Sequence, residues 1–216
     1  MDIPGRLRSE EQCSAIVGSP NISTAAEAAE AAERKEQEEE GHQLNTPWTM
    51  WIDKTERGAS AAEYQASLKK VYTMTTVECF WAVYRNIPNV RDLNQRYTYH
   101  MMRDDRKPLW EDTRNSRGGT WKVKCRKEDS PDVWKELLLA VIGEQFDDFV
   151  AEDDDICGVS ISIRERDDLI QIWNTNAARH EEAKVVEKVR SLLPGVKFSA
   201  IFYKRHETHH AFEGKK

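Results

Sequence analysis

The segment from Ile156 to Asn174 constrains the fold of this chain most strongly. It reads ICGVSISIRERDDLIQIWN, so that apolar and polar residues alternate on both sides of a charged turn. Such alternation has the period of a β-strand, and two alternating runs joined by a turn predict an antiparallel hairpin. The segment TWKVKCRK alternates in the same way and puts Trp121 and Val123 on one face of another strand.

Other segments predict four further strands and three helices. Strands are expected at PWTMWID, SLKKVYTMTT, RYTYHMMRD and VKFSAIFYK. Apolar residues at helical spacing predict helices at TTVECFWAVYRNIP, at SPDVWKELLLAVIGEQF and over 176–192, with Thr75, Ser130 and Asn176 as N-caps. Adjacent strands with single helices between them predict an α+β fold, in which the helices cover one face of an antiparallel sheet. The other face is then free to hold a ligand.

The first 44 residues differ in composition from the rest of the 216-residue chain. Residues 1–44 hold ten acidic and four basic side chains, which account for the whole net charge of −6. Their run AAEAAEAAERKEQEEE has no apolar stripe, so we expect a disordered acidic tail, with an acidic docking segment as the alternative. Residues 45–216 then form one neutral domain, which has no overall field to attract nucleic acid. Binding to RNA would therefore require a local site.

Several features indicate a cytoplasmic protein. No apolar run reaches the length of about eighteen residues that a membrane-spanning helix needs. The N-terminus lacks the apolar segment of a secretory signal. The four cysteines are scattered without a Cys-x-x-Cys pair, which favours reduced thiols in a cytosolic protein. They are Cys13, Cys79, Cys125 and Cys157.

The segment PLWEDTRNSRGGTW places an indole directly before a carboxylate, at Trp110 and Glu111. An aromatic ring can stack on a nucleic-acid base, and it attracts a cationic base more strongly. A carboxylate can accept the two N–H groups of a guanine edge, and these hydrogen bonds strengthen when the base is charged. The pair therefore fits a site for 7-methylguanine. Alternatively, it is a boundary aromatic beside a solvated acid.

The surrounding motifs resemble those of a known family. PWTMWID, TTVECFWAVYRNIP, PLWEDTRNSRGGTW, VWKELLLAVIGEQFDD and GVSISIRERDDLIQIWN occur in this order. Together they resemble the eukaryotic translation initiation factor 4E family over residues 46–212, and the ending FYKRHETHHAFEG is most similar to the third class of that family. The resemblance implies a curved antiparallel sheet with three helices on its convex face and a slot on its concave face. The implied protein is a monomer without enzymatic activity, cofactor or metal, which binds the 7-methylguanosine cap of messenger RNA and regulates translation initiation.

In the family, the base of the cap lies between two aromatic rings. The resemblance implies Trp110 as one ring and Glu111 as the acid that binds the guanine edge. The second ring is a tryptophan in the family, whereas this chain has Tyr64, which offers a cation a smaller aromatic face. Trp48 is the alternative second ring.

For the phosphates of the cap, the resemblance implies Arg164 at a matching position and Arg166 close by. Thr120 and Leu169 stand where the family has an arginine and a lysine. We therefore expect the phosphates to meet fewer positive charges than in the family.

The resemblance also implies a second surface, on the convex face, that receives an amphipathic helix of scaffold or inhibitor proteins. Its residues here are Val77, Trp81, Glu136 and Leu139. This chain departs from the family at Gln43, which replaces a proline, and at Lys135, which replaces a leucine. Both departures are expected to change partner binding. Phe80 and Tyr84, on the same predicted helix, are expected in the core.

Two alternative functions remain. The slot could bind RNA ends weakly and without cap specificity, so that the protein acts mainly by competing for partners. The stretch HETHH, residues 206–210, matches a zinc-hydrolase pattern. That chemistry needs both histidines one helical turn apart and a third ligand, whereas this stretch follows a predicted strand near the end of the sequence. We therefore expect no catalytic residues and no metal site.

Overall fold

The structure is a computed structural model that describes residues 41–55, 58 and 60–208. The acidic segment 1–40 and the end of the HETHH stretch lie outside these residues. The predicted disorder of the tail therefore stays a prediction. The first described strand begins at Gln43, two residues before the domain boundary expected from the sequence.

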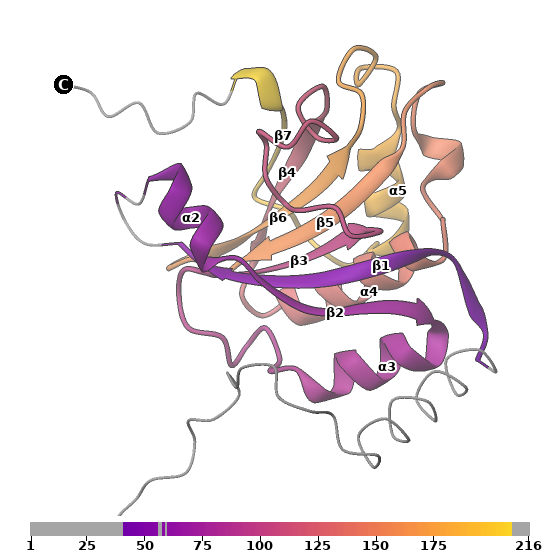
Figure 1. Cartoon of the computed structure of the whole chain (residues 1–216). Coiled ribbons are helices and arrows are strands. Elements are labelled where there is room, and N and C mark those ends of the chain that lie inside the picture. Colours follow the sequence, from indigo (N-terminus) through magenta and orange to yellow (C-terminus); the bar gives the residue numbers. More distant parts are fainter. Residues whose placement is uncertain (1–40, 56–57, 59, 209–216) are drawn as a thin grey trace, which may run out of the picture. The chain divides into compact units, whose positions relative to one another are not determined.

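Seven strands form one antiparallel sheet, in the order β2-β1-β3-β5-β6-β4-β7 (Figure 1). All seven strands predicted from the sequence are confirmed. Their bounds are Gln43–Lys54 for β1, Lys69–Thr76 for β2, Tyr97–Arg103 for β3, Gly119–Arg126 for β4, Ile156–Ser162 for β5, Asp167–Asn174 for β6 and Ala200–Arg205 for β7.

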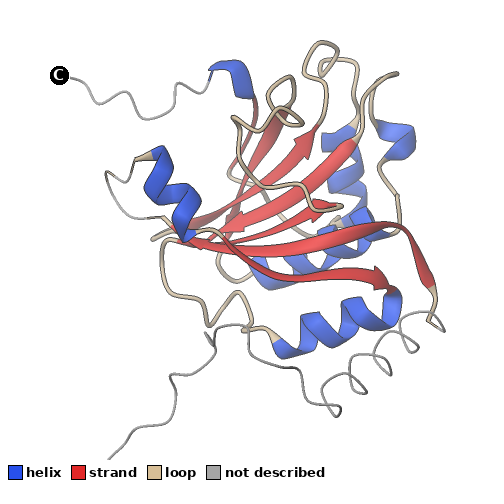
Figure 2. Cartoon of the chain, in the orientation of Figure 1, coloured by secondary structure: helices blue, strands red, loops and turns tan. Residues whose placement is uncertain are grey.

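Three helices cover one face of the curved sheet, as predicted, and a fourth helix lies beyond the end of β1 (Figures 1 and 2). The three are α3 over Val77–Asn86, α4 over Ser130–Ile142 and α5 over Val185–Leu192; the fourth is α2 over Ala61–Ser67. Two short 3₁₀ helices span Asp147–Phe149 and His206–Thr208. Within the described part of the chain, no helix has both the length and the apolar character needed to cross a membrane.

The two faces of the sheet differ in chemistry because successive side chains of a strand project to opposite sides. Directly paired residues of neighbouring strands share a face, so the pairing defines rows across the sheet. One row on the helix-covered face is wholly apolar: Ile52, Tyr99, Ile161, Ile170, Val123 and Ile201. The neighbouring row on the open face is largely polar: Trp51, His100, Ser160, Gln171, Lys122 and Phe202. The apolar rows form the core with α3, α4 and α5.

The predicted helix boundaries need three corrections. The N-cap of α3 is Thr76 and not Thr75, since the Thr76 hydroxyl accepts the N–H of Cys79. Ser130 is the first residue of α4, and its hydroxyl donates to the carbonyl of Arg126. Asn176 caps only a turn, and α5 begins at Val185.

Helix α2 was not predicted from the sequence. Its N-terminus has a complete capping box, in which Ser60 and Glu63 each bond the backbone N–H of the other. The letters SAAE carry this signal. The helix has only seven residues, which is too short for an apolar stripe to be recognised. It places Tyr64 beside the end of β1.

Arg103 of β3 links strands β1 and β5 to the turn that follows α4. Its guanidinium donates two hydrogen bonds of 2.7–2.8 Å to Glu144, after α4, and two more to the carbonyl of Ile156 in β5. A further bond reaches Thr46 in β1, and the Arg103 carbon Cζ lies 4.7 Å from the ring centroid of Trp48. Trp48 is fully buried in this helix-covered core.

We predict that Arg103→Met destabilises the fold by about 3 kcal/mol, because it leaves the half-buried Glu144 without its cation. Urea unfolding followed by tryptophan fluorescence measures this change. The matched control is Arg179→Met, which removes a more exposed ion pair with Glu182 and should change stability little. Equal stability of the two variants would show that the Arg103 cluster does not hold the strands.

Candidate functional site

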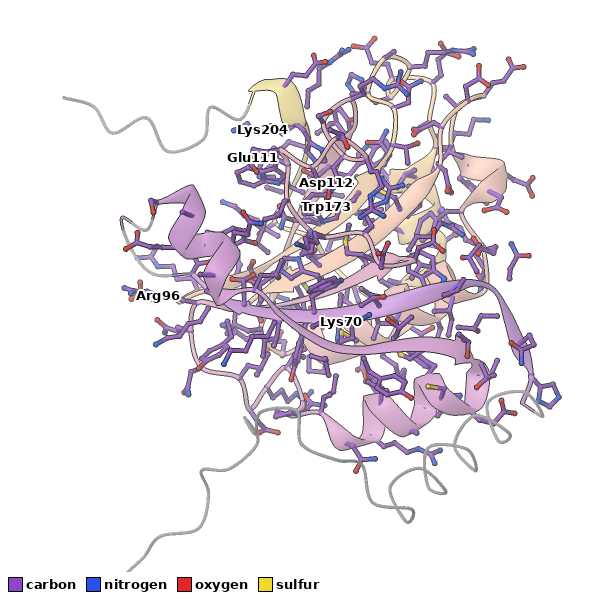
Figure 3. All side chains as sticks on the ribbon, in the orientation of Figure 1. Lys70, Arg96, Glu111, Asp112, Trp173 and Lys204 are labelled. Atoms are coloured by element: carbon purple, nitrogen blue, oxygen red, sulfur yellow. The ribbon has the colours of Figure 1, made fainter. Side chains whose placement is uncertain are left out.

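Trp110 lies in the loop between β3 and β4, over the open face of the sheet. Its half-buried ring packs against an apolar cluster that is separate from the main core. That cluster comprises Trp51, Met102, Cys157 and Trp173, with Leu68 at its edge. In Figure 3, Glu111 and Asp112 lie in this loop, while Trp173 lies on β6 and Lys204 on β7. The motif noted in the sequence thus forms the aromatic part of a site on the open face.

Asn115 organises the Trp110 loop, a role that sequence analysis missed. Its buried side-chain amide donates to the carbonyls of Lys107 and Leu109, at 2.8 and 2.7 Å. The side-chain oxygen accepts from Arg106, and the backbone carbonyl bonds to His206 after β7. These bonds hold the backbone on the N-terminal side of Trp110 in one conformation. A lone asparagine in a polar loop gives no sequence signal for such a role.

Glu111 is exposed beside Trp110, which leaves its carboxylate available to a ligand. It also lies close enough to Tyr64 for its charge to act on the phenol. Burial first, and then the charges of Asp53 and Glu111, raise the pKa of Tyr64 far above its ordinary value. The structure therefore brings Trp110, Glu111 and Tyr64 into one region, as predicted, and Tyr64 is a neutral phenol there.

A chain of hydrogen bonds connects Tyr64 to Trp173 beneath this region. The Tyr64 hydroxyl donates to Asp53, at 3.2 Å, and His100 Nε2 lies 2.6 Å from the same carboxylate. His100 Nδ1 lies 2.7 Å from Ser160 Oγ, which accepts the indole N–H of Trp173 at 2.9 Å. One assignment satisfies every group: Trp173 donates to Ser160, Ser160 to His100, and His100 to Asp53.

Ser160, His100 and Asp53 are ordered like the triad of a hydrolase, but their environment does not suit catalysis. All three residues are buried, and Ser160 is fully inaccessible. Its hydroxyl oxygen already accepts the indole N–H of Trp173. A nucleophile must reach a reacting atom of the substrate. The chain of bonds therefore stabilises the floor of the site.

Positive charge gathers at the β4 side of the Trp110 ring. The ammonium of Lys122, on β4, lies 5.6 Å from the ring centroid. Burial first, then the charges of Lys204 and Arg164, lower the pKa of Lys122 to about 8. Arg164, predicted to bind the phosphates, thus lies close enough to Lys122 for its charge to act on it. Arg166 is exposed in the same β5–β6 turn, but no contact within the described residues ties it to the group.

The prediction for Trp48 is corrected by the pairing of β1. Trp48 pairs with Arg103 and lies with Met50 on the helix-covered face, where it is fully buried. A ligand on the open face cannot reach it. Trp51, three residues later, projects to the opposite face and joins the cluster under Trp110. The sequence PWTMWID contains both indoles, and only the register of β1 separates them.

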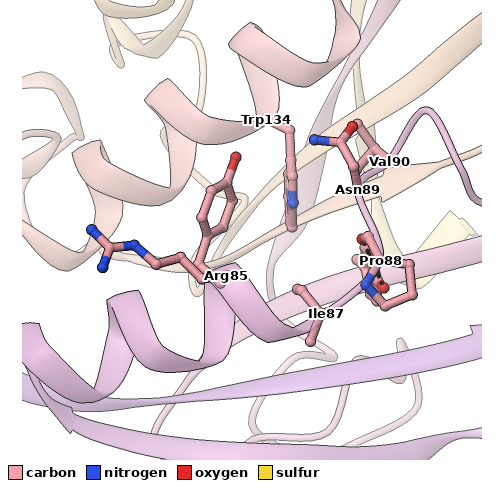
Figure 4. A pocket seen from close by; sticks show the side chains of 8 residues that line it. Arg85, Ile87, Pro88, Asn89, Val90 and Trp134 are labelled. Atoms are coloured by element: carbon pink, nitrogen blue, oxygen red, sulfur yellow. Dashed lines mark hydrogen bonds between the residues drawn. The ribbon is translucent and has the colours of Figure 1, made fainter.

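The predicted partner surface lies across α3 and α4. All four predicted residues are half-buried, so part of each side chain is accessible to a partner: Val77, Trp81, Glu136 and Leu139. Phe80 is fully buried, as expected, but Tyr84 is only half-buried and its ring centroid lies 5.8 Å from that of Trp81. Tyr84 also borders a hollow of about 250 Å³ near the end of α3, into which Trp134 of α4 extends (Figure 4).

Lys135 and His42, the residue before Gln43, each have an acidic partner near this surface. The Lys135 ammonium lies 3.6 Å from the Glu136 carboxylate, so the acid expected to fix a partner helix already has a cation nearby. Before Gln43, the backbone N–H and ring of His42 both bond to Glu78 of α3, at 2.9 and 2.7 Å. These bonds fasten the start of β1 to the first turn of α3.

The HETHH stretch is described only as far as residue 208. His206 is buried, and its Nδ1 bonds to the carbonyl of Asn115 at 2.7 Å. Its ring also packs against Trp173, with centroids 4.9 Å apart. His209 and His210 lie outside the described residues. His206 therefore supports the Trp110 loop, and the metal hypothesis gains no support from its position.

The fold defines a class of α+β protein in which helices cover one face of an antiparallel sheet and an aromatic, charged region lies on the open face. The family model of eukaryotic initiation factor 4E matches residues 43–216. The chain therefore belongs to the eukaryotic initiation factor 4E family. It is 37% identical over 144 residues to eukaryotic translation initiation factor 4E-1 of Hordeum vulgare, which covers 67% of this chain. The chain spans only 65% of the length of that relative.

Solved structures of the same family share the fold. A complex of C. elegans eIF4E-3 with the 4E-binding protein Mextli and a cap analog matches with a TM-score of 0.68 and 31% identity, over 77% of this chain and 93% of that one. Ascaris suum eIF4E-3 with an m7G cap matches with a TM-score of 0.66 and 28% identity, over 81% and 95% of the two chains. Membership of the third class stays a prediction.

His206 should make stability depend on pH. Burial lowers the pKa of His206 from 6.5 to about 4, so the folded state keeps the ring neutral where the unfolded state is protonated. Stability should therefore fall as pH drops from about 6.5 to about 4, by on the order of 2–3 kcal/mol from this group.

Urea titrations at pH 7.5 and pH 5 measure the unfolding free energies of wild type and His206→Gln. The difference in unfolding free energy that favours wild type should be smaller at pH 5 than at pH 7.5. A pH-independent difference between wild type and His206→Gln would contradict the assignment.

Proposed function

We propose that this protein binds the 7-methylguanosine cap of messenger RNA on the open face of its sheet. The observation that carries the proposal is the position of Trp110 and Glu111, which present an indole face and an exposed carboxylate together over the cluster of Trp51 and Trp173. A methylated guanine is cationic, so it stacks on the indole and donates its N1–H and N2–H groups to the carboxylate. Tyr64 borders the same region.

Relatives of known structure support this proposal. The matched C. elegans and Ascaris suum proteins are described in complexes with a cap analog or an m7G cap. The C. elegans protein also binds the 4E-binding protein Mextli in its structure. By analogy, we assign the surface of Val77, Trp81, Glu136 and Leu139 to an amphipathic helix of a scaffold or inhibitor protein. The proposed role is regulation of translation initiation in the cytoplasm.

The base site is tested by Glu111→Gln. Wild type should bind 7-methyl-GDP at least tenfold more tightly than GDP, because a desolvated cation–π contact contributes about 2 kcal/mol. The substitution keeps the shape but removes the charged acceptor, and should weaken 7-methyl-GDP binding by about 1.5–3 kcal/mol. Quenching of tryptophan fluorescence measures both affinities.

The control for this test is Glu128→Gln, which removes an exposed carboxylate after β4. It should leave cap affinity unchanged. Equal affinity of wild type for GDP and 7-methyl-GDP would reject the cap site and favour a non-specific RNA-end binder. Unchanged affinity in Glu111→Gln, with reduced stability, would make Glu111 a structural residue.

The partner surface is tested by Trp81→Ala. Trp81 is accessible, and truncating an interface tryptophan commonly costs 2 kcal/mol or more of binding free energy. We expect the variant to lose binding to 4E-binding helical peptides, measured by calorimetry, and to keep cap binding. Lys135→Leu, which frees Glu136 from its neighbouring cation, should strengthen peptide binding. A folded Trp81→Ala protein with wild-type peptide affinity would place the partner surface elsewhere.

A further inference from the structure

Two lysines on neighbouring strands place positive charge on the open face. Thr120 of β4 and Leu169 of β6 are themselves uncharged. Thr120 of β4, however, pairs directly with Lys204 of β7, so the two side chains share the open face. Lys122 follows two residues later on β4 and projects to the same face. The β4–β7 pairing thus returns positive charge to the region where Thr120 lacks it.

Lys122, Lys204 and Arg164 form a group of cations whose charges act on one another. Within the part of the chain that the structure describes, no carboxylate lies within ion-pair distance of any of the three. Burial first, and then the positive charges of Lys204 and Arg164, lower the pKa of Lys122 to about 8. The uncharged neighbours of Lys122 in its row, Gln171 and Phe202, do not neutralise it. An anion bound among these side chains would relieve the repulsion.

The position of Lys122 connects this group to the base site. Its ammonium lies 5.6 Å from the centroid of the Trp110 ring, as in a cation–π pair. A cationic base stacked on Trp110 brings a second positive charge to the same ring, and the two charges repel. A phosphate next to the base would offer Lys122 a better partner.

We propose that Lys122 moves from Trp110 to the phosphate chain of the bound nucleotide, which it binds together with Lys204 and Arg164. The inference rests on the proposed cap-binding function and assigns the phosphates to β4 and β7 as well as to the β5–β6 turn. It makes the terminal phosphates a condition for tight binding of the base, since they remove the internal cation from the ring.

The test compares 7-methylguanosine with 7-methyl-GDP in wild type, Lys122→Met and Lys188→Met. Methionine keeps the length of lysine without its charge. Lys122→Met should weaken 7-methyl-GDP binding roughly tenfold or more and leave nucleoside binding unchanged or tighter. Lys188 is the matched control. It lies on α5, away from the site, and its ammonium is 5.1 Å from the ring centroid of Phe149. Lys188→Met should behave as wild type.

A second measurement follows the Lys122 ammonium by NMR during a pH titration. Its pKa of about 8 in the free protein should rise with 7-methyl-GDP or with inorganic pyrophosphate, and should not rise with 7-methylguanosine. Pyrophosphate tests the anion site without the base. If wild type fails to prefer methylated nucleotides but pyrophosphate raises the pKa, the proposed function fails and the anion site stands. If Lys122→Met weakens nucleoside and diphosphate equally, or no anion moves the pKa, the role of Lys122 is overturned.

Discussion

The site depends on one interaction, the hydrogen-bonded chain that pairs the buried polar groups of Asp53, His100 and Ser160 on the open face of the sheet. Most side chains of the helix-covered face are apolar, apart from the Arg103 cluster, whereas the opposite face carries Asp53, His100 and Ser160 beneath Trp110 and Tyr64. An unpaired polar group there would cost free energy of the order of 1–3 kcal/mol. The hydrogen-bonded chain from Tyr64 to Trp173 removes this cost. It also fixes two aromatic residues at opposite ends of one network.

The fold could be predicted from the sequence because it follows local periods. Alternation identified β3, β4 and the β5–β6 hairpin, and helical spacing identified α3, α4 and α5. The site could be predicted only where its residues are adjacent in the chain, as Trp110 and Glu111 are. The prediction for Trp48 was wrong because the sequence of a strand with indoles at positions 48 and 51 does not show which indole faces the helices. Asn115 was missed because its partners are set by the folded loop.

The charges of the site also could not be predicted from the order of residues along the chain. Read along the chain, Thr120 and Leu169 suggest a weakly charged site. Across the sheet, Lys204 lies opposite Thr120, and Lys122 is close enough to Lys204 and Arg164 for their charges to act on it. Alternation in TWKVKCRK places Lys122 on the face of its strand opposite to Trp121 and Val123. Only strand order, with β4 between β6 and β7, brings these cations together.

The hydroxyl and the ring of Tyr64 have different roles in the structure. Its hydroxyl is held by Asp53, so the orientation of the ring, and with it the position of α2, is linked to the buried network. A tryptophan at this position would offer more stacking area but could not donate a phenolic hydrogen bond to Asp53. The tyrosine therefore exchanges contact area for a fixed orientation. In the proposed cap complex, stacking on Tyr64 therefore contributes less binding free energy than stacking on a tryptophan would.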